Sequence, residues 1–596
     1  MLPIRGSLMT TKVVGEAAQP NLTHRVRPHD PLWPSESKWD KLSRDVAGRL
    51  LRLPPPLVRC QDSANGGSCD EIFRHLSNPY FIGDQPELTQ TSGWVDAWTS
   101  TPSVYAVAAK RTQDVVAAVN FARDNNLRLV IKGGGHSYQG TSNAADSLLI
   151  WMRAMNKITL HDAFVGKKCE RQQAPQPAVT VEAGAIWMHT YDAVTTKAGR
   201  YVQGGGCATV GVAGLIQSGG FGSFSKKYGL AAAGLLEAEI VTAEGAVRIA
   251  NACLHPDLFW AIKGGGGGSL GVVTRVTLRT RDLPEYFGAV LATIKALSDT
   301  AFRELTTRII DFYHDSLFNH YWGEQIVFGP GNTLRISMLF QGLNQQQAED
   351  LWRPFLVWVS SSPDKFTTEN PAQIAAIPAQ HFWDAKFMQK HFPGVLIADD
   401  RPASPEGNVF WAGDHDEAGH FVHGYRSVWL PAALLTEARR HSLVDALFKS
   451  SRHWEMALHF NKGLAGASAD ELAAARNTAM NPAALDAFAL AICAGDGPAA
   501  FPGIYGHAPD VIVARRHARE IDNSMDELLR VVSSPGSYVA ESNFFERDWQ
   551  KSFWGSNYPR LAAVKKKYDP RGLFFVRHGV GSEEWSEDGF ERLANR

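Results

Sequence analysis

Residues 131–140 read IKGGGHSYQG. The apolar segment that leads into them, 127–131, predicts a short buried strand that runs directly into three glycines. Glycine adopts backbone dihedrals closed to other residues and permits close approach of the main chain. Because His136 and Tyr138 follow at once, the pattern favours a large flat ligand lying against the main chain. The alternative is a tight turn that carries a surface histidine.

A second glycine-rich block, QGGGCATVGVAGLIQSGGFGSFSKKYGL, spans residues 203–230. Glycines at irregular intervals suit a backbone that wraps round a ligand, with main-chain N–H groups available to a pyrophosphate. The block is not a P-loop, because Gly206 and Gly211 have the spacing but are not followed by Lys and Ser or Thr. Cys207 is either a buried thiol or a point of covalent attachment. Metal binding by His136 and Cys207 lacks a third and fourth ligand at zinc-like spacing.

A third block, IKGGGGGSLGVV, contains the pattern GxGxxG at Gly266, Gly268 and Gly271. A Rossmann dinucleotide site needs a strand before this pattern and a helix after it. Here the helix-like segment DLFWAIK precedes it and the strand-like segment VVTRVTLRT follows it. Because the order is reversed, we reject an NAD site of the Rossmann kind.

Together, GGGHSYQG, GGGCATVGVAGLIQSGGFG and HPDLFWAIKGGGGGSLGVVT resemble the PCMH-type flavin-binding domain of the vanillyl-alcohol oxidase superfamily, and most closely the berberine-bridge-enzyme-like oxidases. The segment NYPRLAAVKKKYDPRGLF is similar to that family's C-terminal element, which folds back onto the flavin domain. The resemblance implies FAD bonded twice, through its 8α-methyl group to His136 and through C6 to Cys207. The other cofactor-binding residues that it implies are Gly133, Gly134, Gly135, Ser137, Gly140, Gly206, Thr209, Val210, Gly211, Gly214, Gly219, Gly220, Gly222, Tyr228, Gly229, Gly271 and Val273.

The proton acceptor is the next expectation, because oxidation of an alcohol needs a group that takes the hydroxyl proton as hydride leaves carbon. In relatives a tyrosine or carboxylate supplies it from a segment that resembles SYVAESNFF, so Tyr538 is the first choice and Glu541 a second. Ala540 departs from the asparagine often found there. On the segment WEMALHFNKG, alternation puts His459 on a polar face that points into the active site or is simply a polar sheet surface. Tyr138 corresponds to a substrate-facing tyrosine in carbohydrate-oxidising relatives.

The resemblance therefore implies a bicovalent FAD oxidase that acts on an alcohol or a sugar hemiacetal and reduces O2 to hydrogen peroxide. Val210 stands where relatives that behave as oxidases tend to have valine. Three alternatives keep the same motifs: a dehydrogenase with another electron acceptor, an oxidative cyclase or amine oxidase of secondary metabolism, and a non-catalytic flavin-binding protein. The expected partners are a small-molecule substrate and O2.

The order of predicted helices and strands indicates an α+β fold in a chain long enough for two or three domains. We expect an N-terminal arm over 1–97 with a helix near 39–53, and a flavin domain over 98–283. A substrate domain of antiparallel sheet and helices, one of them over 430–450, follows over 284–535. The segment 536–596 completes the flavin domain. Two local expectations are that Thr112 caps a helix ending at Asn125 and that Lys565, Lys566 and Lys567 form a solvated helix face.

Composition excludes several classes of function. Lys plus Arg is 60 and Asp plus Glu is 61, for a net charge of -1 and a pI of about 7.1, so there is no electrostatic case for nucleic acid or an anionic membrane. No apolar run is long enough to span a bilayer. Residues 1–31 lack the apolar region of a signal peptide, which fits a cytoplasmic protein or one whose leader was removed. The sequence carries no signal for oligomeric state.

The six cysteines are too scattered for a disulfide scaffold. Cys60 and Cys69 flank the loop QDSANGGS and would pair in an oxidising compartment. Cys169, Cys253 and Cys493 are expected to be ordinary buried or loop thiols.

Overall fold

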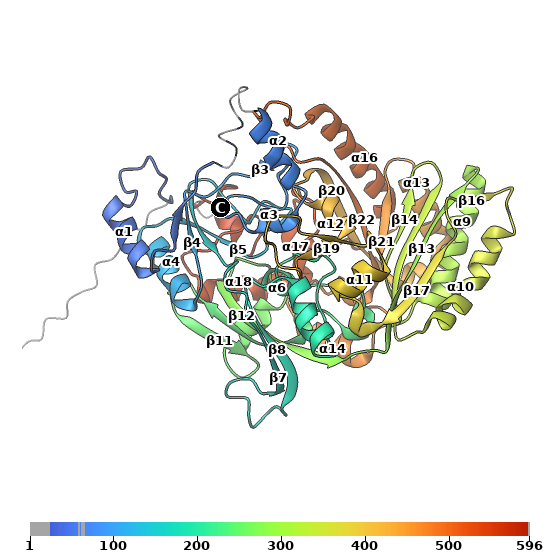
Figure 1. The fold of residues 1–596 in the computed structure, drawn as a ribbon, viewed down its shortest axis with the longest axis horizontal. Coiled ribbons are helices and arrows are strands. Elements are labelled where there is room, and N and C mark those ends of the chain that lie inside the picture. The colour runs from blue at the N-terminus through green and yellow to red at the C-terminus, as the bar shows by residue number, and fades with distance from the viewer. Residues whose placement is uncertain (1–23, 56, 58–59, 61–65, 594–596) are drawn as a thin grey trace, which may run out of the picture.

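The described chain forms two lobes, which Figure 1 shows side by side. The computed structural model of the protein describes residues 24–55, 57, 60 and 66–593. Residues 1–23, which hold most of the segment behind the expectation about an export leader, lie outside this part of the chain. In Figure 1 the blue and cyan elements of the first lobe lie on the left, and helices α9 and α10 of the second lobe lie at the far right.

Two sheets share the hydrophobic core of the first lobe. One has the order β1-β4-β6-β5, with β6 parallel to both β4 and β5, and the other is antiparallel with the order β11-β10-β12-β8-β7. The short strand β9 pairs with β12. The strands are β1 (Leu50–Arg52), β4 (Tyr105–Ala108), β5 (Arg128–Lys132), β6 (Ser147–Trp151), β7 (Ile158–Phe164), β8 (Gln176–Glu182), β9 (Arg200–Val202), β10 (Leu235–Val241), β11 (Val247–Asn251) and β12 (Val272–Asp282). The strand predicted before the first glycine block is therefore confirmed as β5.

Helix α4 (Thr112–Asp124) links the two sheets of the first lobe. Its buried side includes Val115 and Val119, which the 3.6-residue period of a helix places on one face. Thr112 is not the N-cap, however, because Arg111 occupies that position and Thr112 is the first helical residue. The Thr112 hydroxyl instead donates to Glu239 Oε1 at 2.7 Å and ties the helix to β10.

The second lobe is built on a sheet with the order β16-β13-β15-β14-β21-β22-β20-β2-β3, with β17 also paired to β13. All its pairs are antiparallel except β2 with β20, so the expected antiparallel sheet is confirmed. Strand β2 comes from the segment expected to be an N-terminal arm, and β3 from the first two residues of the segment expected to be the flavin domain. The strands are β2 (Gly93–Trp94), β3 (Trp98–Thr99), β13 (Tyr286–Ala296), β14 (Trp322–Gly329), β15 (Thr333–Gln341), β16 (Phe366–Thr368), β17 (Gln373–Pro378), β20 (Phe421–Pro431), β21 (Met456–His459) and β22 (Ala487–Gly497).

Four helices cover one face of this sheet and bury a second core against it. They are α9 (Asp299–Phe312), α10 (Gln345–Ser360), α13 (Glu437–Ser450) and α16 (Val511–Leu529). Met456 and Leu458 of β21 point into that core and are fully buried. By the alternation of a strand, Ala457 and His459 point to the opposite face, which looks toward the first lobe.

Two predicted helices end or begin elsewhere. The helix expected over 39–53 is α1 (Glu36–Asp45), which stops because Ala47 and Gly48 have positive φ and reverse the chain into strand β1. The helix expected from Leu430 begins at Glu437, because β20 continues through Pro431 before a short 3₁₀ turn. The apolar run of that stretch suits a buried strand as well as a helix.

The C-terminal segment returns to the first lobe, where Figure 1 places the end of the chain. It includes α17 (Trp549–Trp554) and α18 (Tyr558–Tyr568). The prediction of a solvated lysine face is wrong for Lys565, which is buried and donates to Ser269 O, Phe574 O and Asp569 Oδ2 at 2.6–2.7 Å. This ammonium group therefore fastens α18 to the third glycine block.

Two disulfides are formed. The predicted pair Cys60–Cys69 is present, although residues 61–65 of the loop between them lie outside the described ranges. Cys169 and Cys253 were expected to be thiols, but they are bonded to each other across a sequence separation of 84 residues. Cys207 and Cys493 are free.

Within the described ranges, no helix combines the length and apolarity needed to cross a bilayer. Nor do three or more His, Cys, Asp or Glu side chains converge there as metal ligands.

Candidate active site

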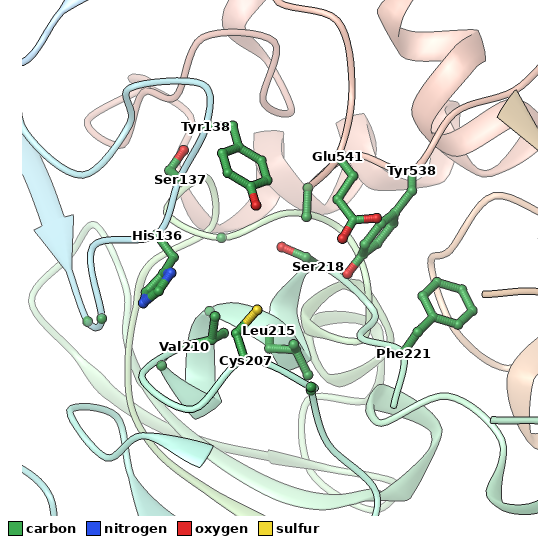
Figure 2. Close-up of a pocket in the computed structure, with 18 of the residues that line it drawn as sticks. His136, Ser137, Tyr138, Cys207, Val210, Leu215, Ser218, Phe221, Tyr538 and Glu541 are labelled. Atoms are coloured by element: carbon green, nitrogen blue, oxygen red, sulfur yellow. The ribbon is translucent and has the colours of Figure 1, made fainter. Parts of the chain in front are cut away.

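A cavity of about 860 Å³ lies between the first lobe and the uncovered face of the large sheet. Figure 2 shows part of its wall, with His136 and Tyr538 facing each other across the space and Cys207 below Glu541. Segments far apart in the sequence meet there, since the C-terminal segment closes one side. The predicted residues that the structure brings into the wall are Gly133, Gly134, Gly135, His136, Ser137, Tyr138, Gly206, Cys207, Val210, Gly211, Gly214, Gly271, Val273, His459, Tyr538 and Glu541.

Other predicted cofactor residues lie behind this wall. A Cβ on Gly140, where φ is +69°, would lie 2.5 Å from the Trp98 ring, so this glycine serves chain packing. Tyr228 packs against Tyr201, with ring centroids 4.4 Å apart. The predicted residues outside the wall are Gly140, Thr209, Gly219, Gly220, Gly222, Tyr228 and Gly229.

His136 is fixed by a neighbour from the second glycine block. Its Nε2 shares a hydrogen bond of 2.9 Å with Thr209 Oγ1. Burial lowers the pKa of His136 to about 3, so the imidazole is neutral at physiological pH. A neutral imidazole with Nε2 engaged keeps Nδ1 as its remaining ring nitrogen.

Cys207 lies in a loop that Trp411 and Asp414 hold on both sides. Trp411 Nε1 donates to Gly206 O at 3.0 Å, and the Ala208 N–H donates to Asp414 Oδ2 at 2.9 Å. The Asp414 carboxylate therefore lies beside Cys207, and both residues line the cavity. Burial raises the pKa of the Cys207 thiol well above its ordinary value, and burial likewise raises the pKa of Asp414 to about 6.

The wall has the shape and the free polar groups that a long cofactor with a flat ring requires. A Cβ on Gly206 or Gly214 would meet no protein atom within 4 Å, so a side chain at either position would protrude into the cavity. Elsewhere in the wall, Ser269 Oγ and His578 Nδ1 are buried without a hydrogen-bond partner. Buried polar atoms of this kind are normally satisfied, so these two are available to a bound ligand.

Glu541 is paired with a lysine. Lys462 Nζ lies 2.6 and 2.7 Å from its two oxygens, and both side chains are less than a fifth exposed. Tyr538 is placed differently, because its phenolic oxygen accepts the Gly220 N–H at 3.2 Å and its ring packs edge-on against Phe221. Burial raises the pKa of Tyr538 far above its ordinary value, so the phenol keeps its proton.

Tyr138 faces a second carboxylate, Glu417. Its ring stacks on that of Tyr425, with centroids 5.0 Å apart. The charge of Glu417 and burial raise the pKa of Tyr138 well above its ordinary value, and burial raises the pKa of Glu417 to about 7. A phenol pair beside a carboxyl group therefore lines this side of the cavity.

The polar strand face predicted around His459 points into the cavity. His459 Nδ1 and Asn461 Oδ1 are buried without hydrogen-bond partners, and burial lowers the pKa of His459 well below its ordinary value. Glu324, on the next strand, accepts from Asn461 Nδ2 at 3.4 Å, and burial raises its pKa.

The wall residues with a charge or a phenol that sequence reasoning missed include Glu324, Asp414, Glu417, Tyr425 and Lys462. Lys462 lies three residues after His459 in the segment WEMALHFNKG. The prediction that His459 faces the active site was the one sequence signal that pointed to Lys462. Asp414 and Glu417 belong to AGDHDE, which has no spacing that distinguishes it from an ordinary acidic helix turn.

Large apolar side chains line the part of the cavity near β13 and β15. Phe382 and Trp383 pack edge-on at 4.9 Å, and Leu339 of β15 faces the same space. Met388 of α11 (Ala385–His391) and Phe392 extend this apolar surface.

Comparison with known proteins agrees with this geometry. A family model described as an FAD binding domain matches residues 103–251, and one described as berberine and berberine like matches residues 537–581. FAD-linked oxidoreductase malF from Malbranchea aurantiaca is 30% identical over 595 residues, which cover 95% of this chain and 93% of the relative. VAO-type flavoprotein oxidase VAO615 from Thermothelomyces thermophilus is 29% identical over 597 residues, which cover 96% of this chain and 95% of the relative.

Solved structures show the same fold. The VAO-type flavoprotein MtVAO615 from Myceliophthora thermophila C1 matches with a TM-score of 0.75 and 25% identity over 94% of this chain and 98% of its own. A glucooligosaccharide oxidase from Acremonium strictum matches with a TM-score of 0.64 and 17% identity over 91% of this chain and 99% of its own. Its FAD is described as 6-S-cysteinyl and 8α-N1-histidyl. The expected resemblance is thus confirmed, and this chain belongs to the FAD-linked oxidoreductases of the VAO-type, berberine-like family.

Proposed function

We propose that the protein is an oxidase whose FAD is bonded to both His136 and Cys207. It would take hydride from a hydroxyl-bearing carbon of an alcohol or sugar hemiacetal. The observation that carries this proposal is the position of both side chains in the wall of one cavity, next to the Glu541–Lys462 pair. The glucooligosaccharide oxidase of the same fold, with its two flavin bonds, supports the assignment of both anchors.

The residues of this chain that would hold the cofactor are those of the glycine-lined wall. Neutral His136 offers Nδ1 for the 8α bond, because its Nε2 is engaged by Thr209. Gly206 and Gly214 leave the surface flat, and Ser269 and His578 offer free polar atoms. When bound, FAD would supply the two-electron chemistry, as the acceptor of the hydride and as the donor of electrons to O2, with hydrogen peroxide as product.

Glu541 is the proton acceptor that the geometry favours over Tyr538. An ionised carboxylate can take a hydroxyl proton, whereas a phenol that keeps its own proton cannot. Lys462 binds both oxygens of Glu541 and fixes its orientation, while Tyr538 is left to donate a hydrogen bond. His459 Nδ1 is free to bond a second substrate hydroxyl.

A second candidate function is supported by the apolar part of the wall. Phe382, Trp383 and Phe392 suit a substrate with an aromatic or polycyclic body better than a free sugar. An amine oxidase or oxidative cyclase of secondary metabolism would use the same flavin anchors and bind its substrate against these rings. A dehydrogenase would likewise share every feature except the use of O2.

Three measurements on the purified protein test these assignments. Yellow colour that stays with the protein after acid precipitation is expected, and its complete release would overturn the covalent bonds. Peroxide should appear stoichiometrically with substrate oxidation, and flavin bleaching without peroxide in air would identify a dehydrogenase instead. Sugars, simple alcohols and aromatic amines compared at equal concentration by flavin bleaching would separate the substrate classes. A flavin that dithionite reduces but no compound bleaches would favour the non-catalytic alternative.

A further inference from the structure

Asp414 is the charged side chain that the structure places against the thiol of Cys207. Asp414 Oδ2 accepts the N–H of Ala208, the residue after Cys207, at 2.9 Å, and Asp414 and Cys207 line the same cavity. Asp414 belongs to α12 (Ala412–Glu417), which follows β19 (Val409–Trp411), and Trp411 Nε1 donates to Gly206 O at 3.0 Å on the other side of Cys207. These two contacts hold the carboxylate beside the thiol, so their proximity is built into the fold.

The thiol itself is poorly suited to react. A thiolate is the nucleophilic form of cysteine, and burial makes Cys207 harder to ionise than a free cysteine. Lys462 is the cation that favours the thiolate, but its ammonium group is paired with Glu541. The Lys462 charge is therefore not free to stabilise a Cys207 thiolate before the reaction. Formation of a bond at sulfur then requires a base in contact with the thiol.

We propose that Asp414 is the base that removes the Cys207 proton when the chain attaches its own flavin. This inference rests on the proposed second flavin bond. Asp414 takes the proton as the Sγ–H bond breaks and Sγ bonds to C6 of the flavin. The hydrogen on C6 leaves as a proton, and the two electrons reduce the flavin ring. Dioxygen then reoxidises the flavin, so that thiol, FAD and O2 give thioether-linked FAD and one hydrogen peroxide.

A purely structural role for Asp414 is the competing explanation, because the carboxylate also anchors the Ala208 N–H. The variant D414N separates the two roles. An asparagine oxygen still accepts that N–H and fills the same volume, but an amide cannot take the thiol proton. Asp414→Glu keeps a carboxylate at a shifted position and should restore the bond in part. Asp416, exposed on the same short helix and absent from the cavity wall, provides the control D416N.

Peptide mass spectrometry after denaturation, alkylation and proteolysis tests the proposal without any measurement of activity. In the wild type and D416N, the Cys207 peptide should carry flavin. In D414N, flavin should remain on the His136 peptide while Cys207 becomes alkylated, with thioether reduced at least tenfold. The absorption spectrum of folded D414N should shift to that of a flavin held through one bond.

Three outcomes would count against the inference. Thioether at the wild-type level in D414N would overturn it. Loss of both bonds in D414N would also overturn it, because the proposed base acts at one bond only and the His136 bond reports that flavin still binds. Absence of the thioether from the wild type would instead refute the second flavin bond of the proposed function, and the two failures are therefore distinguishable.

Discussion

Lys462 Nζ contacts both carboxylate oxygens of Glu541, at 2.6 and 2.7 Å, within the wall of the cavity. The two residues belong to different parts of the chain, one following strand β21 and the other in the C-terminal segment. Their pairing fixes the position of Glu541 beside Tyr538, as Figure 2 shows. Substitution of each of these two residues tests which of them takes part in proton transfer.

Replacement of Glu541 by Gln should lower kcat by about 10²- to 10³-fold, because removal of a positioned general base costs on this order. The flavin should still be bound, since no predicted flavin anchor is changed. Stopped-flow measurement of flavin reduction checks this. Glu546→Gln, in the same segment but outside the cavity wall, is the control for loss of a carboxylate. A rate of flavin reduction unchanged in E541Q would contradict the assignment.

Tyr538→Phe tests the other candidate for the same role. Its phenolic oxygen accepts the Gly220 N–H and its ring packs against Phe221, so Phe keeps the packing and loses one hydrogen bond. We expect less than about a tenfold loss of kcat, well below the range given for a general base. If Y538F instead loses as much activity as E541Q while retaining its flavin, then Tyr538 takes part in the proton transfer itself.

Thr209→Val removes the hydrogen bond to His136 Nε2 with little change in shape. The imidazole then loses its fixed tautomer and orientation. We expect the flavin bond at His136 to form incompletely, while the bond at Cys207 forms as before. The masses of the two flavin peptides measure this directly. Thr209→Ser keeps the hydroxyl and should restore the bond; equal flavin on His136 in all three proteins would show that Thr209 has no such role.

The parts of the site that follow one another in the sequence could be predicted, whereas those joined only by tertiary contacts could not. His136 and Cys207 lie within glycine blocks whose local pattern predicts close approach of the main chain to a ligand. Asp414 touches Cys207 from about two hundred residues further along the chain, in a turn with no distinctive spacing. Cys169 and Cys253 were missed for the same reason, since a disulfide between distant positions leaves no local pattern.

The fold followed a similar rule. Strands bounded by glycines or polar turns, such as β5, were predicted almost to the residue. The helix expected over 430–450 is present from Glu437 onward, but its predicted start was wrong. An apolar run without polar interruption suits a buried strand equally, and pairing of β20 with β22 decided the outcome. Lys565 looked like part of a charged surface because its three carbonyl and carboxylate acceptors come together only after folding.

Gly214→Leu tests whether the glycine-lined wall binds the flavin. A side chain there meets no protein atom within 4 Å of its Cβ and would occupy the cavity, so the protein should fold but contain little flavin. Gly234→Leu is the matched control, because its Cβ also meets nothing within 4 Å but it does not line the cavity. The ratio of absorbance at 450 and 280 nm reports flavin content. Full flavin in G214L would show that the cofactor lies elsewhere.

Glu417 should make stability depend on pH in a direction opposite to that of an ordinary ion-paired carboxylate. Burial raises its pKa to about 7 in the folded protein, against an ordinary value of 4.5. Between these values the unfolded chain loses the proton first, so ionisation favours unfolding. The resulting destabilisation is absent below pH 4.5 and complete above pH 7. Because the Glu417 side chain is open to the cavity, water screens this effect and reduces its size.

Glu417→Gln removes that titration. The variant should match the wild type in thermal midpoint near pH 4.5 and exceed it at pH 8, by on the order of 1 °C for a chain of this size. Differential scanning calorimetry at both pH values measures the difference. Asp416→Asn, one residue away but exposed outside the wall, should show no such pH dependence. If the thermal midpoint of E417Q at pH 8 is instead below that of the wild type, the ionised Glu417 carboxylate stabilises the folded protein through the groups around Tyr138, and the prediction is wrong.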